Sequence, residues 1–108
     1  MEFKNESELF DYIWETRPHF SEISGKKLYE KDHPRWHWQF SHILVKGLYR
    51  LYKLNPDNIS LVLPNEHVFY EHFTNKDRSA PLYKLYREKW DALFEKKAQL
   101  KREYHSGK

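Results

Sequence analysis

Three residues in the central part of the chain, His42, Asn58 and His67, have the side-chain types that metal-dependent hydrolysis of a phosphodiester bond requires. Such hydrolysis needs a base that activates water, a group that orients the base, and a cation that stabilises the leaving oxygen. Histidine suits the first task because its pKa lies near neutrality, and an asparagine side chain suits the second. Glu71 follows His67 at helical spacing, so both side chains share one helix face and can reach one ion. We therefore take His42 as a candidate base, Asn58 as its orienting residue, and His67 with Glu71 as candidate metal ligands.

The elements that position these residues can be predicted from the sequence pattern. Residues 5–16 have apolar side chains at helical spacing, with Asn5 or Ser7 as the cap, and Arg17-Pro18 is expected to end this helix. From Arg35 to Leu44 aromatic and polar residues alternate, which predicts a half-buried strand with Trp36, Trp38 and Phe40 on one face. His42 would then lie near the end of that strand.

A loop from Lys46 to Lys53 and a turn at residues 55–58 separate this strand from a second one, Ile59 to Leu63. A short helix is expected to start at Pro64-Asn65, with Asn65 as its cap. His67 would lie in its first turn. The predicted order from residue 40 to residue 73 is strand, loop, strand, helix.

The C-terminal part of the chain predicts one long helix, from Leu82 to Tyr104, with an apolar stripe along it. Residues 84–108 hold 8 Lys/Arg against 4 Asp/Glu, a net charge of +4, whereas residues 1–83 hold 11 against 12, a net charge of −1. A polyanionic partner is one reason for such a basic helix, and a lysine-solvated surface is the other. If the apolar stripe exceeds what the domain can cover, the helix can also form a homodimer.

Length and composition limit the possible classes. A chain of 108 residues is enough for one domain, and its 19 aromatic residues predict an aromatic core. The absence of cysteine excludes disulfides, thiolate zinc sites and cysteine nucleophiles. No secretory signal and no apolar run of about 20 residues is present, so we expect a cytoplasmic protein with no membrane partner. Glycine-rich phosphate loops and a G-x-S-x-G motif are also missing.

The segment Ser41-His42-Ile43-Leu44-Val45-Lys46-Gly47, the strand that follows Asn58, and His67 together resemble the HNH, or ββα-metal, endonucleases. The resemblance is closest to small phage-associated members with a pattern S-H-I-x-x-K-G, and it covers roughly residues 12–73. It implies an α+β fold for a single domain, residues 1–108, with a ββα-metal core, an N-terminal helix and a basic C-terminal helix at about 82–104. It also implies that His42 is the general base, that Asn58 orients it or fixes the loop, and that His67 binds one divalent cation. Mg or Mn is the expected ion, with Zn or Ni as alternatives.

The chain departs from the family pattern in two ways. Many relatives carry two C-x-x-C pairs that hold a structural zinc, and the corresponding positions here are Ser21, Ser24, Leu63 and Glu66, so no structural zinc is expected. The residue before the base is usually Asp or His and binds the metal. Here it is Ser41, a weak ligand, for which His37, Glu71 and His72 are candidate substitutes.

These patterns leave three readings open. The first is a divalent-metal-dependent endonuclease that acts on DNA, with Lys46, Arg50 and Lys53 as the expected phosphate contacts. The second is the same fold without effective metal binding, used to bind nucleic acid or a protein. The third is an unrelated helical domain, since Asn58 also suits a type I turn after Pro-Asp.

Overall fold

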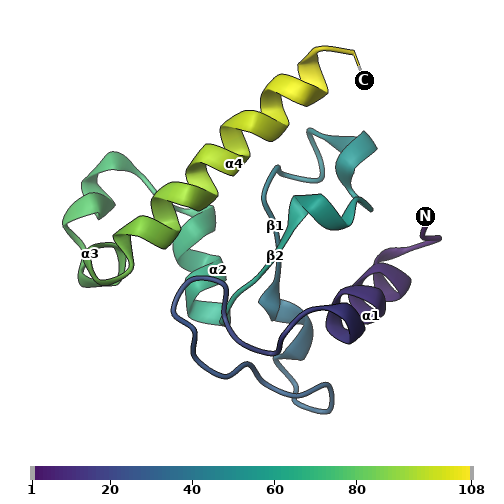
Figure 1. The fold of residues 1–108 in the computed structure, drawn as a ribbon, viewed down its shortest axis with the longest axis horizontal. Coiled ribbons are helices and arrows are strands. Elements are labelled where there is room, and N and C mark those ends of the chain that lie inside the picture. The colour runs from purple at the N-terminus through teal and green to yellow at the C-terminus, as the bar shows by residue number, and fades with distance from the viewer. Residues whose placement is uncertain (1, 108) are drawn as a thin grey trace.

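The computed structural model describes residues 2–107, and its first element is the predicted N-terminal helix, α1, Glu6–Thr16 (Figure 1). Asn5 caps it, because its Oδ1 accepts a hydrogen bond of 3.0 Å from the Glu8 amide. The helix ends where predicted, at extended Arg17 before Pro18. Leu9, Ile13 and Trp14 form its buried face.

Two short strands, β1 (Phe40–His42) and β2 (Ile59–Leu61), pair antiparallel, with Phe40 opposite Leu61 and His42 opposite Ile59. The predicted strand from Arg35 to Leu44 is thus wrong over its first half, where Trp36–Gln39 form a 3₁₀ turn, η1. The cause is Gln39, whose buried amide bonds to both the N–H and the C=O of Tyr29 at 2.6 and 3.2 Å. The second strand is also two residues shorter than the predicted Ile59 to Leu63.

Helix α2, Pro64–Glu71, follows β2 directly, which gives the predicted strand, strand, helix order. Its cap is Leu63 and not Asn65, and Pro64 takes the first helical position. The Glu66 carboxylate accepts the Leu63 amide at 2.8 Å, so the N–H of the cap residue is bonded by a side chain from the first turn of the helix.

The C-terminal helix is interrupted, contrary to the prediction of one helix from Leu82 to Tyr104. A 3₁₀ turn, η4 (Asn75–Ser79), leads into α3 (Pro81–Leu85), and after Tyr86 the chain continues as α4 (Arg87–His105). The break arises because the Trp90 indole N–H donates to the Leu82 carbonyl at 3.1 Å, while the Tyr86 amide bonds to Tyr83. In a continuous helix Tyr86 would donate to Leu82 instead.

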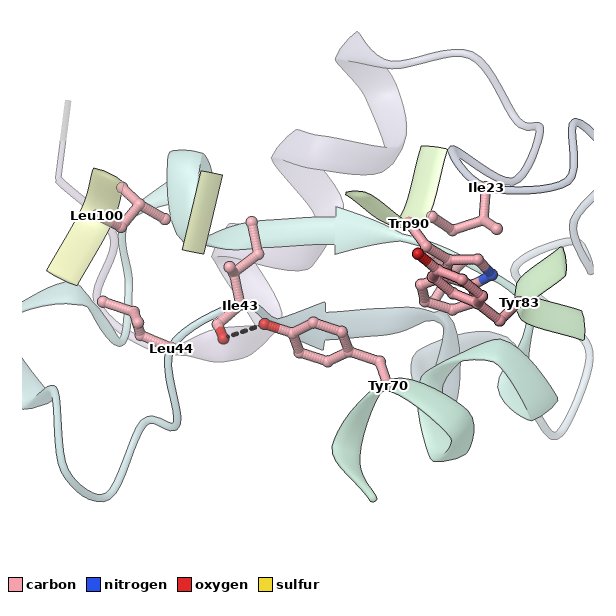
Figure 2. Packing of buried hydrophobic residues seen from close by; sticks show 8 residues of the cluster. Ile23, Ile43, Leu44, Tyr70, Tyr83, Trp90 and Leu100 are labelled. Atoms are coloured by element: carbon pink, nitrogen blue, oxygen red, sulfur yellow. Dashed lines mark hydrogen bonds between the residues drawn. The ribbon is translucent and has the colours of Figure 1, made fainter. Parts of the chain in front are cut away.

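The sheet separates two apolar clusters, with α1 on one side and α4 on the other (Figure 1). Phe40, Ile59 and Leu61 pack with the buried face of α1. The second cluster joins the ends of the strands to α2 and α4, and Figure 2 shows the Tyr70 hydroxyl donating to the Ile43 carbonyl at 2.6 Å within it. Within residues 2–107, only five of the 15 buried residues of the two clusters are aromatic, whereas ten of the 14 partly buried residues packed against them are, so the predicted aromatic character lies at the edge of the core and its centre is aliphatic. The fold is therefore α+β, as expected, with an N-terminal helix and a long C-terminal helix.

A buried polar contact ties the turn at residues 21–26 to α2. The Ser21 hydroxyl donates to the Glu66 carboxylate at 2.5 Å and accepts the amides of Ile23 and Ser24 at 3.0 and 3.1 Å. Ser21 and Glu66 are two of the four positions that the family resemblance assigns to zinc cysteines. A hydrogen bond thus joins, in this chain, the two segments that the cysteines would connect.

None of the helices within residues 2–107 is long and apolar enough to cross a membrane.

Candidate active site

A cleft of about 560 Å³ lies where β1, α1, α2 and α4 meet. The sequence-predicted residues His42, Lys46, His67 and Glu71 line it. His37 and His72, the two candidate substitutes for a metal ligand, line it as well. The fold therefore brings His42 of β1 together with His67 and Glu71 of α2 in one cleft.

His42, the last residue of β1, is held by the backbone of the loop that follows. Its Nε2 lies 3.0 Å from the Lys53 carbonyl oxygen. Because a carbonyl only accepts, this nitrogen carries the proton, and Nδ1 is the free acceptor of the neutral ring. Burial lowers the pKa of His42 from its ordinary 6.5, although the bond to Lys53 and the nearby charge of Glu6 oppose the shift. The imidazole is accordingly neutral at physiological pH, the state a base needs.

Asn58 is fully buried behind the cleft and does not line it. Its Oδ1 accepts the Leu44 amide at 2.8 Å, and its Nδ2 donates to the carbonyls of Leu44 and Tyr52 at 3.1 and 3.3 Å. Its side chain thus clamps the two ends of the loop between the strands. Tyr52 precedes Lys53, whose carbonyl holds His42, so Asn58 reaches the imidazole only through the backbone.

His67 and Glu71 face each other across one turn of α2. His67 Nδ1 lies 2.7 Å from the Trp38 carbonyl oxygen and therefore donates to it, which leaves Nε2 as the acceptor in the neutral ring. Nε2 lies 3.3 Å from Glu71 Oε2. A neutral imidazole nitrogen and a carboxylate oxygen are both electron donors, so this pair needs a proton or a cation between its members.

Ser41 is not brought into the cleft with the other predicted ligands. It lies opposite Ser60 in the sheet, and alternation places both on the face away from Phe40 and His42. Ser60 lines a small hollow against Ala92 and Leu93 of α4. Both serine hydroxyls are buried and have no hydrogen-bond partner within residues 2–107. The position suits packing against α4 and not metal binding.

Glu6 is a site residue that could not be identified from the sequence pattern. It lies in the first turn of α1, and only the packing of α1 on the sheet brings it to the cleft. Its Oε2 is 2.8 Å from Lys46 Nζ and 3.7 Å from His42 Nε2. Burial raises the pKa of Glu6, but the hydrogen bond and charge of Lys46 outweigh it and lower the pKa overall.

Of the expected phosphate contacts, Lys46 lines the cleft and is paired with Glu6, while Arg50 and Lys53 are exposed on the adjoining loop. Lys97 of α4 also lines the cleft, with its ammonium group 5.5 Å from the centre of the Tyr70 ring. The sequence indicated a basic α4 but not that this lysine reaches the site.

A larger hollow of about 750 Å³ lies elsewhere, between residues 18–25 and residues 84–89. It contains no histidine or aspartate, and its only hydroxyls are those of two serines and a tyrosine. We therefore place the candidate chemistry in the smaller cleft, where imidazoles and carboxylates meet.

No protein-family model, curated protein or solved structure matches the chain.

Proposed function

We propose that the protein is a divalent-metal-dependent endonuclease of the HNH type that hydrolyses phosphodiester bonds in DNA. The observation that carries this proposal is that two histidines line one cleft, each held at one ring nitrogen by a backbone carbonyl. Within residues 2–107 the opposite ring nitrogen of each, Nδ1 in His42 and Nε2 in His67, has no backbone partner, and His67 Nε2 faces the Glu71 carboxylate at 3.3 Å. One is thereby suited to accept a proton and the other to bind a cation. The proposal also places the protein in the cytoplasm.

His42 is the general base in this proposal. Its lowered pKa keeps the ring neutral, and Nδ1 takes the proton of the attacking water while Nε2–H stays on the Lys53 carbonyl. The charge that develops on the ring is then stabilised by Glu6, whose Oε2 lies 3.7 Å from Nε2. A base positioned in this way contributes about 10²–10⁴ in rate.

His67 and Glu71 would hold the cation. A metal-binding histidine commonly donates its other ring N–H to a carbonyl, as His67 does to Trp38. Mg²⁺ and Mn²⁺ are usually held by one or two protein ligands and complete their shell with water and substrate phosphate. When bound, such an ion supplies positive charge for the scissile phosphate and the leaving oxygen. The pair therefore fits the ion, with the substrate as a further ligand.

The DNA backbone would lie along the loop between the strands. Arg50 and Lys53 make no ion pair within residues 2–107 and are exposed beside the cleft, while Lys46 and Lys97 line it. Such lysines and arginines contact phosphates without reading sequence, so they fix the position of the strand and leave the base preference open.

The test is cleavage of supercoiled plasmid and of a single-stranded oligonucleotide with Mg or Mn. The wild type should cleave, and His42→Ala should lower the rate about 10²–10⁴-fold while folding and DNA binding stay intact. His67→Ala should lose activity through metal affinity, so a higher metal concentration should restore part of it. The matched control is His105→Ala, because His105 is exposed on α4 and does not line the cleft. If the wild type cleaves neither substrate with Mg, Mn, Zn or Ni, the proposed endonuclease activity is refuted.

A second candidate is the same fold used as a DNA-binding module without cleavage. One observation favours it: Ser41, which stands where the family resemblance expects a metal ligand, faces away from the cleft. DNA binding of normal affinity in a protein that cleaves with no metal would select this function.

A further inference from the structure

A groove of about 360 Å³ adjoins the cleft, and its chemistry differs from that of the cleft. Trp38, Pro64 and Val68 are its apolar residues, and Trp38 and Val68 are exposed, at 55% and 56%. Arg35 and Asn65 are its exposed polar residues outside the metal pair. Trp38, His67 and Glu71 line both the groove and the cleft, so the two hollows are adjacent.

The exposure of Trp38 sets it apart from the other tryptophans. Trp14 and Trp90 are buried at 7% and 0%, and Trp36 is half-buried against Trp14 and Phe40. The η1 turn directs Trp36 into the core and leaves Trp38 outside. The predicted strand would have placed both tryptophans on one face, and the structure separates them. An indole left in water beside a site is available to a flat ligand.

We propose that this groove binds a nucleobase next to the scissile phosphate, stacked on the indole of Trp38; this rests on the function proposed above. Three features favour a nucleotide over an apolar peptide side chain. The groove shares Trp38, His67 and Glu71 with the cleft where the phosphodiester would lie. Residues 33–56 hold four Lys/Arg and no Asp or Glu, which favours a polyanion. The Arg35 guanidinium and the Asn65 amide can both bond to a base edge or a phosphate.

Stacking at Trp38 is coupled directly to the metal pair. The carbonyl of Trp38 accepts the His67 Nδ1–H at 2.7 Å, so the residue that holds the base also orients the ligand. A base and its own phosphate are separated by one sugar. A base fixed on Trp38 therefore places the adjoining phosphate at His67 and Glu71, which is where positioning contributes to rate.

The same geometry defines the class of substrate. A base within a duplex is stacked on both faces by its neighbours, and an indole can reach it only after it unstacks. The groove thus selects DNA with an unpaired base beside the scissile phosphate: a single strand, a loop, a gap or a frayed end. Sequence tolerance is expected, since every base has a π-face.

The experiment follows Trp38 fluorescence in the His42→Ala variant, with EDTA present so that nothing is cleaved. Trp38 is the most exposed tryptophan, so a short oligothymidylate that stacks on it should quench its emission and block its quenching by iodide. The Trp38→Phe variant should lose this signal yet bind nearly as well, because phenylalanine still stacks. The Trp38→Ala variant should bind about 5- to 150-fold more weakly, the loss of one base–aromatic stack. The matched control is Phe20→Ala, since Phe20 is 54% exposed and lines the other hollow.

Fluorescence anisotropy of labelled single-stranded and duplex oligonucleotides gives the affinities independently of Trp38. A single-strand preference that disappears in Trp38→Ala and persists in Phe20→Ala supports the subsite. If Trp38→Ala changes neither binding nor cleavage, the proposed base-binding groove is refuted and the proposed nuclease activity is not. A wild type that binds no DNA of either kind overturns both.

Discussion

Asn58 should contribute more to stability than any other polar side chain of the site, and the Asn58→Ala substitution measures this. Its loss leaves the buried Leu44 amide without an acceptor, which costs about 1–3 kcal/mol. The carbonyls of Leu44 and Tyr52 lose one donor each, at about 0.5–1.5 kcal/mol apiece. The total is about 2–6 kcal/mol. At about 4–8 °C per kcal/mol for a small domain, the midpoint of about 4 kcal/mol lowers Tm by about 16–32 °C.

Thermal and urea unfolding followed by circular dichroism give this number. The matched control is Asn55→Ala in the same turn, where one solvated bond from Asn55 to the Asp57 amide is lost, at about 1 kcal/mol. Nitrogen-detected NMR of the His42 ring adds a readout beyond stability. Asn58 bonds to the Tyr52 carbonyl, and the neighbouring Lys53 carbonyl bonds to His42 Nε2. The Nε2 proton of His42 should therefore exchange with water faster in Asn58→Ala.

The Asn58→Asp variant sharpens the test, because it keeps the size of the side chain and changes only its hydrogen-bonding. One carboxylate oxygen still accepts from Leu44, but the other faces two carbonyl oxygens. Burial and these carbonyls raise the pKa of the introduced Asp in the folded state, so its stability is greatest at acid pH and falls as the pH rises through that pKa. If Asn58→Ala unfolds at the same temperature as Asn55→Ala, the hydrogen bonds of Asn58 to the two ends of the loop do not stabilise the fold as proposed.

Two further predictions concern the turn at residues 21–26 and the loop between the strands. Ser21→Ala should cost about 1–3 kcal/mol in urea unfolding, because a buried carboxylate and two amides lose their partner; Ser24→Ala, at an exposed bond of 3.4 Å, should cost almost nothing, and equal losses would refute the bridge. Neutralising Lys46, Arg50 and Lys53 together should weaken DNA binding and flatten its log–log salt dependence by roughly one unit per lost contact, less for Lys46, which is paired with Glu6. An unchanged slope of the salt dependence would indicate that the phosphate contacts lie on α4 instead. The control neutralises three lysines that do not line the cleft, Lys84, Lys89 and Lys96.

The parts of the fold that local signals determine could be predicted from the sequence. Asn5 and Arg17-Pro18 bound α1 because a cap and a proline act within a few residues. The turn at residues 55–58 and the order β1, β2, α2 were equally accessible, since turn residues and proline act locally. The errors at Trp36–Gln39 and at Tyr86 come from contacts made at a distance. The alternation of Trp36, Trp38 and Phe40 predicts a strand, but the hydrogen bonds of Gln39 with Tyr29 stabilise a 3₁₀ turn there instead. The helical pattern around Tyr86 is interrupted because the Trp90 indole N–H bonds to the Leu82 carbonyl.

The candidate site shows the same division. His42, His67 and Glu71 could be named because they belong to one contiguous segment with a recognisable spacing. Glu6 and Lys97 could not, because α1 and α4 reach the cleft only through packing on opposite sides of the sheet. Ser41 was placed among the ligands as the neighbour of His42, yet alternation along β1 turns its side chain to the other face.

The pH dependence of single-turnover cleavage, at saturating magnesium, tests the role of His42 most directly. Only the neutral imidazole can take a proton from water, and burial lowers the pKa of His42 below 6.5. The wild-type rate should therefore rise with pH to a midpoint below 6.5 and stay level above it. His42→Ala should remove that step and leave a rate lower by about 10²–10⁴-fold. A profile of the same shape and height in both proteins would contradict the proposed general base.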